Sequence, residues 1–265
     1  MLLPLYDKNP HRRFPFVTVL LIAANVFFFW QSVSGPDQPT GFIRTVLEYG
    51  FVPARLTEID SGEAVQIQQQ LPDGKAVQAK LSTDSADVYT TIFTMMFLHG
   101  GILHLVSNVW MLWVFGDNVE DRLGRFIYLL FYVLGGVVAI LTQWYIDPTS
   151  TKPVIGASGA VAAVLGAYVV TFPAAKVKTL VFIGLPLVFD LPSVVVLGGW
   201  FLLQTIAGVA AIGVGAPAEM EVSVAFWAHI GGFVAGVVLM PLLTIGVTPP
   251  GEPDWRTESR EAFEF

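Results

Sequence analysis

Ser158 and His229 are the two residues whose types most directly suggest chemistry. Ser158 lies in Gly-Ala-Ser-Gly at 156–159, and His229 lies in Ala-His-Ile-Gly-Gly at 228–232. A serine hydroxyl becomes a good nucleophile when a neighbouring base accepts its proton, and histidine titrates near neutral pH. The two residues are therefore a candidate Ser–His dyad. Taken singly, each also fits helix packing, in which small residues, serine and histidine form interhelical contacts.

A second polar set consists of His99, His104 and Asn108. On a helix, His104 and Asn108 share one face, whereas His99 is turned away from His104 by about 140°. The side chains of His104 and Asn108 can both donate hydrogen bonds to one anion, as an oxyanion site requires. A zinc site is not favoured, because the sequence has no cysteine and no His-Glu-x-x-His motif. We therefore expect an oxyanion site, with no metal and no cofactor.

The composition is that of a membrane protein. The chain has 265 residues, of which 54% are hydrophobic and only 13% charged, whereas soluble domains average about 25% charged residues. The formal net charge of -7, from 14 basic and 21 acidic residues, argues against nucleic-acid binding. The expected surroundings of this chain are therefore a lipid bilayer.

Six apolar stretches are long enough to cross the roughly 30 Å of hydrocarbon as helices. They are residues 14–36, 88–116, 126–146, 153–175, 191–218 and 222–251. A further apolar run at 179–189 is too short and is interpreted as a buried or interfacial connection. The expected fold is an all-α polytopic bundle of six transmembrane helices.

Basic residues in the short segments predict the orientation, because cytoplasmic loops carry an excess of lysine and arginine. They are Lys8, Arg12, Arg13, Arg122, Arg125, Lys176 and Lys178. Both termini are then cytoplasmic, and the second, fourth and sixth spans start at the outer face. His104, Asn108, Ser158 and His229 all fall in one leaflet, with Ser158 and His229 some 6–12 Å below the outer surface.

The first loop, residues 37–87, is long enough to have its own structure. Residues 64–71 and 75–81 alternate apolar and polar side chains around Pro72-Asp73-Gly74, which predicts a small β-hairpin. Residues 41–56 suit an element lying in the membrane interface. The expected organisation is a cytoplasmic N-terminus at 1–13, a membrane domain at 14–246 and a polar tail at 247–265.

In these motifs the sequence resembles the rhomboid family of intramembrane serine proteases. The resemblance spans about residues 49–243. The matching residues are His99, His104 and Asn108, Phe115-Gly116-Asp117-Asn118-Val119-Glu120 with Leu123-Gly124, Gly156-Ala157-Ser158-Gly159, Trp200 and Gln204, and Ala228-His229 with Gly232 and Gly236.

The resemblance implies a six-helix rhomboid core with catalytic Ser158 and His229 and with oxyanion donors His104 and Asn108. It implies cofactor-free cleavage of transmembrane protein substrates that enter near the second and fifth helices, with small residues before the cut. Glu120 becomes a structural hydrogen-bonding residue. A bacterial inner membrane is the simplest expected location, with the site opening to the periplasmic side.

The chain also departs from the family pattern. The first loop lacks the Trp-Arg pair of many members, and Ala162 stands one turn after Ser158 where some members place an aromatic residue against the histidine. An alternative is therefore a catalytically weak or inactive rhomboid-like protein that binds transmembrane helices. A small transporter with a histidine relay is a third interpretation, but it predicts repeats and further midplane charges that the sequence lacks.

Overall fold

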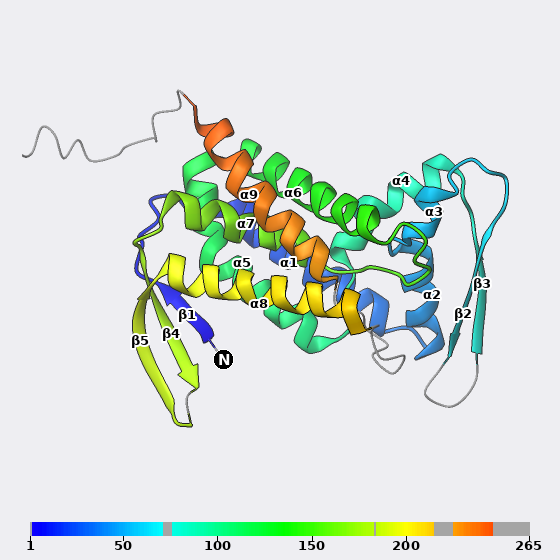
Figure 1. Ribbon diagram of the computed structural model, residues 1–265, viewed down its shortest axis with the longest axis horizontal. Helices are drawn as coiled ribbons and strands as arrows, with labels where there is room; N and C mark the ends of the chain where they lie inside the picture. Colours follow the sequence, from blue (N-terminus) through cyan, green and yellow to red (C-terminus); the bar gives the residue numbers. More distant parts are fainter. Residues whose placement is uncertain (1, 71–75, 183, 215–224, 246–265) are drawn as a thin grey trace, which may run out of the picture.

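The computed structural model describes residues 2–70, 76–182, 184–214 and 225–245. Figure 1 shows long helices running side by side, with one small β-sheet at each end of the bundle. In chain order the elements are β1 Leu2–Asp7, α1 Phe16–Val33, α2 Thr40–Tyr49, α3 Pro53–Thr57, β2 Val65–Gln70, β3 Ala76–Leu81, α4 Ser85–Thr94, the 3-10 helix η1 Met95–Phe97, α5 Ile102–Leu123, α6 Arg125–Ile146, α7 Ser158–Thr171, β4 Lys176–Phe182, β5 Pro186–Pro192, α8 Ser193–Val214 and α9 Phe226–Thr244.

Four helices in the described part are long and apolar enough to cross a membrane, namely α1, α6, α8 and α9. A fifth span results if α4, η1 and α5 are counted together, although this pair is bent by 80°. The expected single helix at 88–116 is therefore wrong, because the chain breaks between η1 and α5. The protein is a mostly helical, multi-pass membrane protein. In the described residues, four or five of the six expected spans are formed by helices that are long and apolar enough to cross the membrane.

Helix α7 does not reach the length expected for the stretch 153–175. Its 14 residues rise about 21 Å, which is shorter than the roughly 30 Å of hydrocarbon. Every residue from 159 to 168 is buried, and the helix packs against α5, α6 and α9. Because α7 is surrounded by other helices, it does not need to span the full thickness of the hydrocarbon, and its ends can contact protein.

A three-stranded antiparallel sheet, in the order β1-β4-β5, forms one end of the bundle. The fold is therefore mostly helical, as expected, but not all-α. Residues 179–189, expected to be a connection, belong largely to β4 and β5. Val177 and Thr179 are fully buried and their neighbours less so, which is the period-two pattern of a strand. Gly184 has φ +96 at the turn between the strands, a conformation that glycine adopts without strain.

Strands β2 and β3 pair antiparallel at the opposite end of the bundle, as the alternation in the first loop predicted. On one face of this pair of strands, the side chains of Ile67 and Leu81 pack against Val52 and against Leu47 of α2. The intervening Pro-Asp-Gly segment lies outside the described residues. We call α2, α3, β2 and β3 the first-loop module.

Glu120 near the end of α5 anchors the start of α1. Its carboxylate accepts hydrogen bonds from the backbone N–H groups of Val17 and Thr18, at 3.0 and 2.8 Å, and from the Thr18 hydroxyl at 2.9 Å. The residue before α1 is Pro15, which provides no side-chain cap. The structural hydrogen bonding expected of Glu120 is confirmed.

The predicted polar tail at 247–265 lies outside the described residues.

Candidate active site

Ser158 is the first residue of α7, and backbone hydrogen bonds hold the segment before it. The N–H of Gly156 donates to the carbonyl of Met95 at 2.9 Å. Val154 and Phe51 exchange both backbone hydrogen bonds, at 2.7 and 3.0 Å. These contacts fix the serine at a helix N-terminus, where backbone N–H groups have no partner within the helix.

His229 lies in the first turn of α9 and reaches Ser158 because α9 packs very closely against α7. A Cβ on Gly232 would collide with the carbonyl of Gly159, and one on Gly236 with a carbonyl one turn further along α7. We predicted that His229 faces the same helix as Gly232 and Gly236. This is confirmed, and the helix is α7. Nε2 of His229 lies 2.8 Å from Oγ of Ser158, so the structure brings the two expected dyad residues together.

Gln204 of α8 provides the second hydrogen bond of the imidazole. Its Oε1 lies 2.9 Å from Nδ1 of His229. With the Nδ1–H donating to this carbonyl oxygen, Nε2 keeps its lone pair and accepts the hydrogen of the Ser158 hydroxyl. Sequence reasoning included Gln204 in the family pattern but assigned it no role. The signal was its polarity within an apolar span, where a hydrogen-bonding side chain is costly unless it has a partner.

Trp200 lies beside the imidazole, on the face of α8 that also carries Gln204. The centroids of the Trp200 and His229 rings are 5.9 Å apart, with an angle of 39° between the planes. Ala162 is fully buried and has no ring to offer. The aromatic contact of His229 therefore comes from α8 and not from α7.

The side chains of His104 and Ser158 both lie close to Gly156. The backbone N–H of Gly100 donates to Nδ1 of His104 at 3.3 Å, so the imidazole proton is on Nε2. A Cβ built on Gly156 would lie 2.7 Å from His104 Nε2 and 3.6 Å from Ser158 Oγ. Gly156 is buried, with φ +124. The absence of a side chain at this position lets the His104 ring lie against the backbone of Gly156, close to the serine hydroxyl.

Asn108 lies one turn after His104 and is buried. Its Nδ2 donates a hydrogen bond to the backbone carbonyl of His104 at 2.9 Å, and among the described residues it makes no hydrogen bond with Ser158. An amide nitrogen carries two hydrogens, so one donor of Asn108 stays available. His99 is fully buried, and its ring meets that of His104 edge-on, with centroids 5.2 Å apart.

The arrangement joins a hydroxyl, an imidazole and an amide in one hydrogen-bonded chain across α7, α9 and α8. The hydroxyl can lose its proton to Nε2, and the amide holds the imidazole in the required tautomer. Ser158 and His229 are both half-buried, so the reacting atoms are not sealed from the surroundings. A serine nucleophile with a histidine base would require contacts of this kind.

Comparison with known proteins places this site in a family context. The family model described as the Rhomboid domain matches residues 86–245, which include all of the residues just described from the helical core. The match begins after the first-loop module.

Individual relatives match shorter stretches. The chain is 36% identical over 83 residues to the presenilin-associated rhomboid-like protein A, mitochondrial, of Danio rerio, which is 30% of this chain and 21% of that protein. It is 37% identical over 76 residues to the Rhomboid protease GluP of Bacillus subtilis, strain 168, covering 29% and 14%. It is 29% identical over 164 residues to Rhomboid protein 1, mitochondrial, of Saccharomyces cerevisiae, covering 60% and 43%. The matched regions thus cover less than half the length of each relative.

Proposed function

The chain belongs to the rhomboid family, and on that premise we propose that it is an intramembrane serine protease that hydrolyses peptide bonds in or near transmembrane segments. The observation that carries the proposal is the 2.8 Å contact between His229 Nε2 and Ser158 Oγ, together with the 2.9 Å contact of His229 Nδ1 with Gln204. One relative is named a rhomboid protease, and its activity comes to this chain only as part of this proposal.

In the first step, His229 Nε2 takes the proton of the Ser158 hydroxyl while Oγ forms a bond to the carbonyl carbon of the scissile peptide. The electron pair of the carbonyl moves to its oxygen, giving a tetrahedral oxyanion. The Gln204 carbonyl keeps the Nδ1–H of the imidazole in place throughout, so that Nε2 always points at the serine.

The oxyanion requires hydrogen-bond donors close to Ser158. We propose that these are Nε2–H of His104, the free N–H of Asn108 and backbone N–H groups at the start of α7. Protonated His229 then gives its proton to the leaving amine, and the C–N bond breaks. Water attacks the remaining acyl ester with His229 again as base, which releases the second product and restores Ser158.

Substrates are proposed to reach the site sideways, between α5 and α8. In α8, only 22% of the apolar stretch Ser193–Ala210 is buried within the protein. In α6, 39% of an apolar stretch of the same length is buried. Helix α8 is therefore held by few protein contacts and faces the bilayer over most of its surface. Since α8 also carries Gln204 and Trp200, a transmembrane helix that enters along it arrives directly at His229.

We further propose that the chain crosses the membrane six times, with α4 to α5 as one bent crossing and α7 as a short enclosed one. Lys8, Arg122, Arg125 and Lys178 lie in or next to elements at the end of the bundle that carries β1, β4 and β5. By the positive-inside rule this end is cytoplasmic. The bacterial inner membrane stays a prediction, and two of the relatives are named as mitochondrial.

The test is cleavage of a model transmembrane substrate by the purified protein in detergent. Ser158→Ala and His229→Ala are each expected to lower kcat by about 10⁴-fold or more, because nucleophile and base act as a unit. A fluorophosphonate probe is expected to label the wild type and not Ser158→Ala. Matched controls are Ser61→Ala in an exposed loop and His11→Ala, whose imidazole contacts Asp117 of α5.

Cleavage by Ser158→Ala at the wild-type rate would exclude the dyad. If no form cleaves and the probe labels none of them, the protein is the inactive helix-binding alternative. Pull-down of the intact substrate by all forms alike would then support that function.

A further inference from the structure

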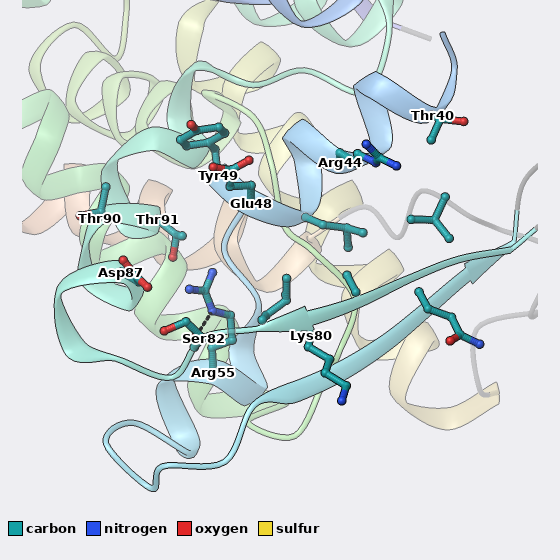
Figure 2. Close-up of a pocket in the computed structure, with 15 residues that line it drawn as sticks. Thr40, Arg44, Glu48, Tyr49, Arg55, Lys80, Ser82, Asp87, Thr90 and Thr91 are labelled. Atoms are coloured by element: carbon teal, nitrogen blue, oxygen red, sulfur yellow. Dashed lines mark hydrogen bonds between the residues drawn. The ribbon is translucent and has the colours of Figure 1, made fainter. Parts of the chain in front are cut away.

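A groove of about 700 Å³ lies between the first-loop module and α4, with β3 on one side and α2 and α4 on the other. Figure 2 shows the side chains that surround it. The groove belongs to the end of the bundle that carries β2 and β3 (Figure 1). It is separate from Ser158 and His229, neither of which lines it.

The groove follows the free edge of β3. All six consecutive residues from 77 to 82 line it, although their side chains alternate between the two faces of the strand, and no residue of β2 does so. The sheet has two strands, and in the described part of the chain no backbone hydrogen bond joins β3 to a third. Alternate N–H and C=O groups of β3 therefore point into the groove unpaired, as a template for another strand.

The walls of the groove suit an extended polypeptide with alternating side chains. Leu47, Ala79 and Leu81 supply an apolar surface on the buried side, while Lys80 and Arg44 are exposed. An added strand would turn every second side chain toward the apolar surface and the others toward solvent.

Arg55 indicates the charge of the occupant. Its side chain is buried, with an exposed fraction of 4%. Nε donates to the carbonyl of Ser82 at 2.8 Å, but Nη1 has no hydrogen-bond partner. Burial is the main cause that lowers the pKa of Arg55, and the charge of Asp87, which also lines the groove, opposes this shift. The two side chains form no salt bridge within 4 Å. A buried donor without a hydrogen-bond partner is costly, and an anionic group placed beside Arg55 would accept a hydrogen bond from Nη1 and add to the partial compensation that Asp87 provides.

We propose that this groove binds an extended peptide segment by strand addition to β3, with an acidic side chain of the peptide against Arg55. The occupant is the part of a transmembrane substrate that leaves the bilayer next to its membrane helix, a statement that rests on the proposed function. A lipid headgroup can also be anionic, but it has no peptide backbone that could form hydrogen bonds with the free edge of β3.

The groove is joined to the active site through a short path along the chain. Tyr49 lines the groove, and Phe51, two residues later, pairs with Val154. Val154 precedes Ser158 by four residues. A segment held on β3 thus tethers its substrate to the element that positions the serine.

The binding test uses the full chain carrying Ser158→Ala in detergent micelles, so that cleavage plays no part. The probe is a fluorescein-labelled eight-residue peptide of alternating threonine and valine with one central glutamate, and anisotropy reports binding. Replacing that glutamate by glutamine is expected to weaken binding about tenfold, through loss of one charge-assisted hydrogen bond. Two forms of the peptide, N-methylated at odd or at even amides, are expected to differ, because only one set of N–H groups faces β3.

Protein variants check the location of the bound peptide. Arg44→Glu and Lys80→Glu change exposed residues of the groove and are expected to weaken binding of the glutamate peptide, whereas Lys152→Glu, outside the groove at the same end, is expected to leave it unchanged. Arg55→Met gives the same loss if the variant folds. Equal binding of both N-methylated peptides, or full displacement of the peptide by short-chain phosphatidylglycerol together with unchanged binding to Lys80→Glu, would overturn the proposal.

A second arm uses the active protein and two transmembrane substrates that differ outside the membrane, one with the glutamate peptide and one with a glycine-serine segment. The glutamate substrate is expected to have a KM about tenfold lower with the same kcat. Equal KM values would refute the role of the groove in substrate binding. If neither substrate is cleaved while the peptide still binds, the proposed protease function fails and the groove stands.

Discussion

At the scale of single residues, an uncharged amide orients the imidazole of His229. Gln204 accepts the Nδ1 hydrogen bond at 2.9 Å, and Ser158 faces Nε2 at 2.8 Å. A carboxylate at this position would put a charge inside a membrane protein, whereas an amide with a partner is less costly to bury. The amide sets the tautomer but would not neutralise the charge that His229 gains in the proposed reaction.

Gln204→Leu is expected to lower kcat by about tenfold with little change in KM. Loss of one neutral hydrogen bond costs about 1 kcal/mol, and here it leaves the imidazole free to turn away from Ser158. The measurement is steady-state cleavage of the model substrate in detergent. Gln204→Glu is expected to restore the acceptor and to move the acid limb of the pH–rate profile to higher pH, since a carboxylate stabilises the imidazolium.

The matched control is Thr205→Val, next to Gln204 on α8. The Thr205 hydroxyl donates to the carbonyl of Phe201 at 2.9 Å and makes no contact with the dyad among the described residues. It is expected to keep the wild-type kcat. A Gln204→Leu protein as active as this control would refute the positioning role.

The sequence predicted the site unevenly at this scale. Ser158, His229 and His104 stand out because reactive side chains are rare within apolar spans. In the structure Ser158 contacts His229, and the side chain of His104 lies close to Gly156, as the serine hydroxyl does. The role of Gln204 was not predictable from spacing, because its bond to His229 depends on how α8 lies against α9. The bond from Asn108 to the carbonyl of His104 depends in the same way on a side-chain rotation that no sequence pattern encodes.

At the scale of elements, the sequence predicted where apolar helices lie but not how each one is enclosed. Hydropathy measures composition and does not distinguish lipid from protein as the surroundings. The short length of α7 was missed for this reason, since its residues are as apolar as those of a full span. The 80° bend before α5 was missed because an apolar stretch was read as one continuous helix through Gly100 and Gly101.

The glycine contacts between α7 and α9 hold His229 close to Ser158. Gly236→Ala is expected to destabilise the protein by about 1–3 kcal/mol, because overpacking forces helices apart, and to lower activity as His229 moves away from Ser158. Its added Cβ would meet a backbone carbonyl, which cannot rotate away. Thermal unfolding and substrate cleavage on the same preparation measure both effects.

The control for this substitution is Gly198→Ala on α8, where a Cβ would meet nothing within 4 Å. It is expected to leave stability unchanged or slightly raised, since alanine favours helices. If Gly236→Ala and Gly198→Ala unfold at the same temperature, close packing of α9 on α7 is not what holds the site together.

At the scale of the whole molecule, the end opposite the dyad is tied together by the N-terminal strand. Asp7 at the end of β1 accepts hydrogen bonds from the Tyr168 hydroxyl of α7 at 2.6 Å and from the Asn118 amide of α5 at 2.9 Å. Lys8 pairs with Asp190 of β5 at 2.6 Å. Both ends of α7 are thus held in place. Strand β1 holds the C-terminal end through Tyr168, and the hydrogen bonds around Gly156 hold the N-terminal end.

This tie makes stability depend on pH. Burial is the main cause that raises the pKa of Asp7 from its ordinary value of 3.8 to about 6, and the nearby Asp117 adds to it. Because the pKa is raised in the folded protein, the stability that protonated Asp7 contributes is complete below about pH 4 and is lost as the pH rises through 6. After allowance for solvent screening of a partly exposed group, the loss amounts to about 1–2 kcal/mol.

Asp7→Asn removes the charge and keeps an oxygen that can accept both hydrogen bonds. The variant is therefore expected to unfold at the same temperature as the wild type near pH 4 and at a higher temperature at pH 8, with the difference developing between those values. Thermal unfolding of both proteins in the same detergent across this range measures it, and the difference between them cancels the titration of all other groups. A difference in unfolding temperature that stays constant from pH 4 to pH 8 would show that ionisation of Asp7 does not limit how firmly β1 holds α7.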